Sequence, residues 1–187
     1  MKILAISGSL RDESLNTKLL QSAAELVDDA VEVEVWDGLK AVPPYDEDDE
    51  AGAAPIAVAR LRAAFDQADA VLFATPEYNA SIPGQLKNAL DWVSRPMATN
   101  PLRNLPVAVI GASSGAFGAV WAQAELKKVV ATIGARVIDA ELPVSHAATC
   151  FDADGDLIDN EIRGRLVEVT NQLVTAAYER QAIQATG

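Results

Sequence analysis

Cysteine and histidine are almost absent from this sequence. The single cysteine, Cys150, excludes an intrachain disulfide and a zinc ribbon, and it fits a reducing cytoplasm. The single histidine, His146, supports no catalytic triad, because no serine has an identified carboxylate relay beside it. Hydrophobic runs are also short: the apolar start, Ile3 to Ile6, is too short for a membrane span or a signal-peptide core. We therefore expect a soluble, cytoplasmic protein.

Basic residues are scarce beside acidic ones. The chain has 15 Lys and Arg against 27 Asp and Glu, which gives a formal net charge of −12 with histidine neutral. So acidic a surface repels nucleic-acid phosphates and anionic lipids, and no local cluster of basic residues offsets it. Nucleic acid and membrane are thus excluded as partners. The length of 187 residues suits one domain over 1–187, and 50% hydrophobic residues can fill its core.

Apolar runs alternate with helical patterns along the whole chain. Strands are expected at 3–6, 31–35, 70–74, 107–110 and 136–139. Helices are expected at 15–27, at 55–67, from Pro83, at 119–133 and along a C-terminal stripe from Ile158 to Leu173. This alternation is typical of an α/β fold in which helices cover both faces of a parallel sheet.

The strand patterns also predict the order of the sheet. The runs at 3–6, 70–74 and 107–110 are continuously apolar, as in strands buried on both faces, whereas 31–35 alternates Val with Glu and 136–139 carries two charges. The second and fifth strands are therefore edges. This predicts a flavodoxin-like, doubly wound, five-stranded parallel sheet of order 2-1-3-4-5, because a dinucleotide-binding order would bury the second strand. A ligand crevice is expected at the carboxyl ends of the first and third strands.

The loop after the first strand, Ser7 to Thr17, leads into a helix whose first turn carries small polar residues. A helix N-terminus offers unpaired N–H groups and partial positive charge, and Arg11 adds a planar donor fork, so the loop favours phosphate. The alternative is an ordinary helix capped by Ser14, with Gly8 in a turn. Neither the Walker pattern nor G-x-G-x-x-G is present.

The loops after the third and fourth strands lie at the same end of the sheet. Pro76 and Pro83 frame a stiff segment that would display backbone amides and Tyr78 toward a flat, polar heterocycle, unless it is only a rigid connection with Tyr78 in the core. The loop 111–118 has three glycines and two serines, which permit close approach to a ligand, although a flexible turn would look similar. The three loops together indicate a mononucleotide with a ring system.

Three motifs carry a resemblance to a known family. They are Gly8–Arg11 with Ser14 and Asn16, Pro76–Asn79 continuing through Ser81 and Pro83 to Trp92, and Ser113–Gly115. The chain resembles the NADPH-dependent FMN reductases, a family that includes quinone, chromate and azo-dye reductases. The similarity spans nearly the whole chain.

The resemblance implies an FMN cofactor and NAD(P)H as reductant. A hydride would pass from nicotinamide C4 to flavin N5, and two electrons would pass on to a quinone-like, azo or chromate acceptor or to free FMN, in a homodimer or homotetramer. No catalytic side chain and no metal would be needed. The implied cofactor-binding residues are Ser9, Arg11, Asn16 and Thr17 at the phosphate, Pro76, Glu77, Tyr78 and Asn79 along the isoalloxazine, and Ser113, Ser114 and Gly115 near its pyrimidine side.

Some features leave alternatives open. Many relatives have a second glycine and an arginine where this chain has Gly118 to Trp121, so the preference between NADPH and NADH is open. Backbone N–H groups of Ser113 to Gly115 are expected to stabilise the anionic reduced flavin. Leu90 and Trp92 belong either to the core or to a subunit face. The segment from Cys150 to Glu161 has part of a calcium-loop spacing, but a thiol is a poor calcium ligand, so an acidic turn that caps the last helix is expected instead.

Two other functions compete with the reductase. A flavodoxin-type electron carrier would bind the same cofactor without oxidising NAD(P)H directly. A flavin-sensing interaction protein would instead use its acidic face to dock a partner.

Overall fold

One five-stranded parallel sheet, in the order β2-β1-β3-β4-β5, forms the centre of the computed structural model, which describes residues 1–186. Its strands are β1 (Lys2–Ser7), β2 (Glu32–Trp36), β3 (Ala70–Ala74), β4 (Pro106–Ala112) and β5 (Arg136–Val144). The predicted flavodoxin-like order is confirmed. The burial pattern from which this order was predicted is also observed: β3 and β4 are buried throughout, while β2 and β5 at the edges are partly exposed.

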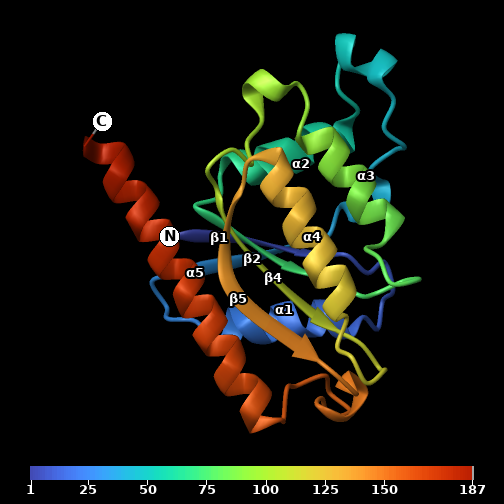
Figure 1. Cartoon of the computed structure of the whole chain (residues 1–187), viewed down its shortest axis with the longest axis vertical. Helices are drawn as coiled ribbons and strands as arrows, with labels where there is room; N and C mark the ends of the chain where they lie inside the picture. The colour runs from blue at the N-terminus through green and yellow to red at the C-terminus, as the bar shows by residue number, and fades with distance from the viewer. Residues whose placement is uncertain (187) are drawn as a thin grey trace.

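Helices cover both faces of the sheet (Figure 1). On one face lie α1 (Leu15–Leu26) and α5 (Asn160–Thr186), and on the other lie α2 (Ile56–Asp66), α3 (Gly84–Val93) and α4 (Val120–Ile133). Alternate residues of β1 separate the two cores: Ile3 packs against α1 and α5, whereas Leu4 packs on the side of α2 and α3. Short 3-10 helices, η1 (Leu39–Ala41), η2 (Glu47–Ala51), η3 (Met97–Thr99) and η4 (Ala147–Thr149), lie in the connections.

Two elements differ from the sequence-based expectation. Strand β5 extends to Val144 rather than ending at 139, because its pairing with β4 shifts between Val107 and Val109 and then continues to Ala112. Helix α5 begins at Asn160, so Ile158 lies before it and is exposed, and the helix continues to Thr186. Burial in α5 extends past the predicted stripe to Ala177, and the last turns of the helix are exposed.

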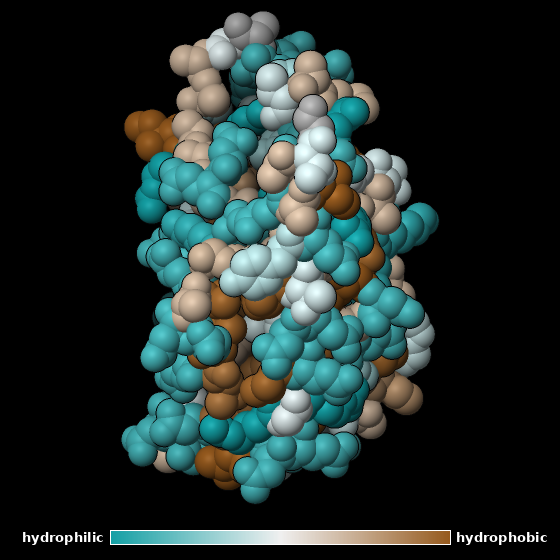
Figure 2. Space-filling view, turned by 90° about the vertical axis from the view of Figure 1, so that its left-hand side faces the viewer, coloured by the Kyte–Doolittle hydropathy of each residue, from teal (hydrophilic) through white to brown (hydrophobic). Residues whose placement is uncertain are grey.

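The side of the molecule that carries α5 is mostly polar. Figure 2 shows this side, where polar side chains surround a band of apolar ones. Over residues 1–186, no helix is both long enough and apolar enough to cross a membrane.

The acidic segment 43–50, which follows β2, is hydrogen-bonded to α3. The indole N–H of Trp92 donates to the Pro43 carbonyl at 2.9 Å, and the Tyr45 backbone N–H donates to the Asn88 side chain at 2.7 Å. The Tyr45 hydroxyl donates to the Glu50 carboxylate within the segment. Leu90 and Trp92 are both buried, so the core interpretation of these residues is correct and a subunit face on them is wrong.

The Tyr45 hydrogen bond predicts a late-titrating tyrosine. The bond to Glu50 raises the pKa of Tyr45 from 10.0 to about 12. Between these values the unfolded chain releases the phenol proton while the folded chain retains it, so the stability from this bond is lost as pH rises through that window. We expect ultraviolet titration to resolve one late tyrosinate among the three tyrosines, and Tyr45→Phe to remove it. A Tyr45→Phe protein with an unchanged late component would contradict this contact.

Candidate functional site

Three loops meet at the carboxyl edge of the sheet, as the sequence predicts. They follow β1, β3 and β4 and enclose a cavity of about 150 Å³. Its lining consists of Ser9, Arg11, Ser14, Leu15, Asn16, Pro76, Glu77, Tyr78, Ala112, Ser113 and Ser114. Eight of the eleven predicted site residues are therefore brought together, and the other three, Thr17, Asn79 and Gly115, lie outside this lining.

The first turn of α1 leaves backbone donors free at the cavity. Ser14 is the N-cap, and its hydroxyl accepts from the Thr17 N–H at 3.2 Å. No group among residues 1–186 accepts from the N–H of Leu15 or of Asn16. The predicted Ser14 cap is confirmed, and it does not conflict with the phosphate-cradle interpretation, which stays a prediction: the cap satisfies one donor and leaves two others for an anion.

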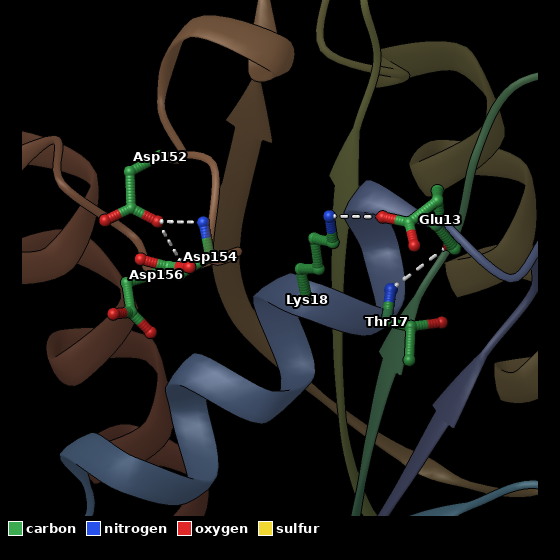
Figure 3. Close-up of polar contacts among 7 residues, drawn as sticks. Glu13, Thr17, Lys18, Asp152, Asp154 and Asp156 are labelled. Atoms are coloured by element: carbon green, nitrogen blue, oxygen red, sulfur yellow. Dashed lines mark hydrogen bonds and ion pairs between the residues drawn. The ribbon is translucent and has the colours of Figure 1, made fainter.

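Arg11 supplies a free cation at the same place. Its side chain is exposed, and no carboxylate among the described residues pairs with its guanidinium. Nearby, Lys18 and Glu13 form an ion pair at 2.7 Å (Figure 3), and this hydrogen bond lowers the pKa of Glu13. Lys18 is thus neutralised by a neighbour, while Arg11 remains available to a ligand. Two free N–H groups and a guanidinium are the donor set that a phosphate monoester requires.

Asn16 has a second role that the sequence did not reveal. Its side chain is buried, donates to the Ala112 carbonyl at 3.0 Å and accepts from the Ala112 N–H at 2.9 Å. Because Ala112 ends β4, these two bonds join the first loop to the third. The partners are 96 residues apart, so no local sequence signal could have identified them.

Thr17 faces a different cavity. Its hydroxyl donates to the Ser7 hydroxyl at 2.9 Å. It lines a neighbouring cavity of about 380 Å³, between α1 and the end of β2, which shares only Ser9 and Arg11 with the first. The structure thus separates Thr17 from Asn16, while Ser9 and Arg11 line both cavities.

The loop after β3 forms a tight turn that exposes Tyr78. Asn79 and Ala80 have φ values of 53° and 59°, and the Tyr78 and Ser81 backbones exchange two hydrogen bonds across them. Tyr78 is 48% exposed, so the alternative in which it packs into the core is wrong. Asn79 is exposed at the tip, where asparagine tolerates the left-handed conformation, and it does not line the cavity.

Glu77 connects this loop to α4. One carboxylate oxygen accepts from the N–H of Trp121 at 3.0 Å and of Ala122 at 3.1 Å. The N-cap of α4 is Ala119, whose side chain cannot accept, so Glu77 satisfies the free donors from the neighbouring loop. A carboxylate at a helix N-terminus stabilises the helix. The sequence did not predict this contact, because Glu77 is 44 to 45 residues from its partners.

The third loop has fewer free amides than expected. The Ser113 N–H donates to the Val144 carbonyl at 3.0 Å, and the Gly115 N–H donates to the Ser113 hydroxyl at 3.1 Å. Within residues 1–186, only the Ser114 N–H of these three lacks an acceptor. The expectation that all three amides point at a ligand is therefore wrong for Ser113 and Gly115, because they stabilise the loop itself.

The acidic segment before α5 is a self-contained turn. The Asp152 carboxylate accepts from the N–H of Asp154 at 3.0 Å and of Asp156 at 2.9 Å (Figure 3). Asp159 then accepts from the first N–H groups of α5, those of Glu161 and Ile162. The expected acidic turn with a helix cap is confirmed.

Comparison with known proteins agrees with this geometry. Residues 1–149 match the family model of the NADPH-dependent FMN reductases. An NAD(P)H-dependent FMN reductase of Pseudomonas aeruginosa is 43% identical over 164 residues, which cover 87% of this chain and 88% of that protein. A 2-hydroxy-1,4-benzoquinone reductase of a Burkholderia species is 35% identical over the same share of each chain.

A solved structure is similar in both fold and sequence. FerB, a flavoenzyme NAD(P)H:(acceptor) oxidoreductase from Paracoccus denitrificans, superposes with a TM-score of 0.85 and is 35% identical. The match covers 95% of this chain and 97% of FerB. The chain therefore belongs to the NADPH-dependent FMN reductase family.

Proposed function

We propose that this protein is an FMN-dependent NAD(P)H oxidoreductase that delivers electron pairs to a quinone-like, azo or chromate acceptor or to free FMN. One observation carries the proposal: one cavity is lined by Leu15 and Asn16, whose N–H groups have no acceptor within residues 1–186, and by Arg11, which pairs with no carboxylate there. A phosphate monoester fits this donor set. The names of the relatives, which are FMN and quinone reductases, support the same activity and offer no support for an electron carrier.

The roles of the lining residues follow from their positions. Ser9, Arg11 and the N-terminal turn of α1 would hold the FMN phosphate. Pro76 and Tyr78 on one side, and Ser113 and Ser114 on the other, would border the isoalloxazine, with the free Ser114 N–H as the polar contact. Asn16 would act through its bonds to Ala112, which hold the first and third loops at a fixed separation.

The side chains and backbone of the protein would bind and orient FMN. When bound, FMN supplies the chemistry of accepting a hydride from a nicotinamide and passing two electrons to an acceptor. The protein's net charge of −12 repels the anionic reductant, so attraction has to come from cations close to the site. Lys40, which lines the neighbouring cavity with Arg11, pairs with no carboxylate among the described residues.

The proposal includes the cytoplasm and a homodimer or homotetramer, as predicted from the sequence. Burial raises the pKa of the lone Cys150 thiol, which makes this thiol less reactive than an exposed one. Light scattering on a sizing column would measure the subunit number.

A spectrum and two assays test the proposed activity. The purified protein, incubated with FMN and desalted, is expected to retain a visible flavin spectrum. With a quinone present, it should consume NADH or NADPH, and parallel assays with the two nucleotides give the preference. A colourless protein that oxidises neither nucleotide would overturn the proposed function, while a flavin-loaded protein that oxidises neither would favour an electron carrier.

A further inference from the structure

A larger cavity adjoins the proposed FMN site. It is the neighbouring cavity of about 380 Å³ between α1 and the end of β2, and small-molecule sites have volumes of about 300–1,000 Å³. It shares Ser9 and Arg11 with the cavity that the proposed function assigns to FMN. Both shared residues belong to the group that would hold the FMN phosphate. The neighbouring cavity therefore begins where the phosphate end of FMN is expected to lie, and the proposed function gives it no ligand.

Hydrogen bonds hold two walls of the neighbouring cavity in place. In the wall formed by β1 and α1, the Thr17 hydroxyl donates to the Ser7 hydroxyl at 2.9 Å. In the wall formed by η1, the Gln85 side chain from α3 donates to the Leu39 carbonyl at 2.8 Å and to the Val42 carbonyl at 2.7 Å. Because these walls are already ordered, a ligand loses little of its binding free energy to ordering them.

The charges of the lining suit a phosphate that is attached to a hydrogen-bond donor. They are two cations and two carboxylates, Arg11, Lys40, Asp12 and Asp37. Neither cation pairs with a carboxylate among residues 1–186, so Lys40 is available to a second phosphate beyond the one assigned to Arg11. Because the two carboxylates offset the two cations, the lining favours a ligand that also presents hydroxyl or amino groups over a bare anion.

Other lining residues suit a ribose and a base. Asp37 directly follows β2, and its side chain is 91% exposed, with the Arg60 guanidinium 3.9 Å away. In dinucleotide-binding folds an acidic residue accepts from the ribose 2′-OH group, and Asp37 offers the same acceptor. Leu10, which is 41% exposed, and Val35 add apolar surface for the face of a base. A phosphate, a ribose and a base together make a nucleoside monophosphate.

We propose that the neighbouring cavity binds the adenosine monophosphate half of FAD, so that this protein takes FAD as well as FMN. The inference rests on the proposed function, which places the FMN phosphate at Ser9 and Arg11. In FAD a diphosphate joins the flavin half to the adenosine half, so the adenosine half leaves from the point where the two cavities share residues. The reductant carries the same adenosine phosphate group, but its nicotinamide has to reach the isoalloxazine beside Pro76 and Tyr78, which do not line the neighbouring cavity.

Titration of both flavins into Lys40→Ala tests the proposal. We expect the dissociation constant of FAD, measured by calorimetry, to rise about tenfold, because one charge-assisted contact with a phosphate is lost. The dissociation constant of FMN should stay unchanged. Lys128→Ala is the matched control, since it removes an exposed lysine of α4 that lines neither cavity, and it should leave both constants unchanged. Equal FAD dissociation constants in Lys40→Ala and Lys128→Ala would overturn the proposal.

The Trp36 indole gives a readout that does not depend on affinity or turnover. Trp36 lines the neighbouring cavity but not the FMN cavity. In ¹H–¹⁵N spectra its indole signal, assigned by its absence from Trp36→Phe, should move further with FAD than with FMN, and an identical signal with the two flavins would overturn the proposal.

The remaining outcomes separate this inference from its alternatives. A Lys40→Ala protein with a raised KM for NADH and unchanged FAD affinity would overturn the proposal and assign the neighbouring cavity to the reductant. A protein that binds FMN but not FAD would overturn this inference alone. A protein that binds neither flavin would overturn the proposed function as well.

Discussion

Replacing Arg11 by alanine is expected to weaken FMN binding about a hundredfold. A charge-assisted, two-point contact between a guanidinium and a phosphate contributes about 3 kcal/mol, which corresponds to this factor. Because the side chain is exposed and pairs with no carboxylate among residues 1–186, the free energy of unfolding should hardly change. Fluorescence titration of the flavin would give the dissociation constants for both proteins.

Riboflavin, which lacks the phosphate, provides the sharpest control. Arg11→Ala should leave riboflavin affinity unchanged if the guanidinium binds only phosphate. Lys40→Ala is a matched variant, since it removes a cation that lines the neighbouring cavity but not the proposed phosphate site. Equal losses of FMN and riboflavin affinity in Arg11→Ala would show that the residue acts elsewhere than at the phosphate.

Replacing Asn16 by alanine is expected to be the most destabilising substitution at the site. It leaves the Ala112 N–H and carbonyl without their partners, and both lie in the buried end of β4. Each orphaned buried group costs about 1–3 kcal/mol, so we expect the free energy of unfolding in urea to fall by about 3 kcal/mol. FMN affinity should fall as well, because the N-terminus of α1 loses its connection to β4.

Two variants bracket this result. Asn16→Asp keeps an acceptor for the Ala112 N–H but places a buried carboxylate oxygen against the Ala112 carbonyl, so we expect a loss of stability at least as large as that of Asn16→Ala. Asn171→Ala, on the exposed surface of α5, should change stability by no more than about 0.5 kcal/mol. If Asn16→Ala proved as stable as Asn171→Ala, the two bonds to Ala112 would contribute nothing.

The sheet could be predicted because its determinants are local in the sequence. Continuous apolar runs identified the buried strands, and the Val and Glu alternation at 31–35 marked an edge. The length of β5 could not be predicted in the same way, because the shift in its pairing with β4 depends on a neighbouring strand.

The sequence predicted where the site lies, but it did not predict most of the hydrogen bonds within it. Loops at the carboxyl ends of parallel strands must share one edge, which brought Arg11, Pro76 and Ser113 together. The side-chain partners of Asn16 and Glu77 lie 96 and 44 to 45 residues away, so they follow from the folded arrangement and not from any motif. The amide of Gly115 is likewise used within its own loop, which composition alone does not reveal.

A crystal structure of the FMN-saturated protein tests the central claim most directly. The account predicts phosphate oxygens within hydrogen-bonding distance of the N–H groups of Leu15 and Asn16 and of the Arg11 guanidinium. A flavin bound with its phosphate away from the N-terminus of α1, or no flavin in the cavity at saturating FMN, would contradict it.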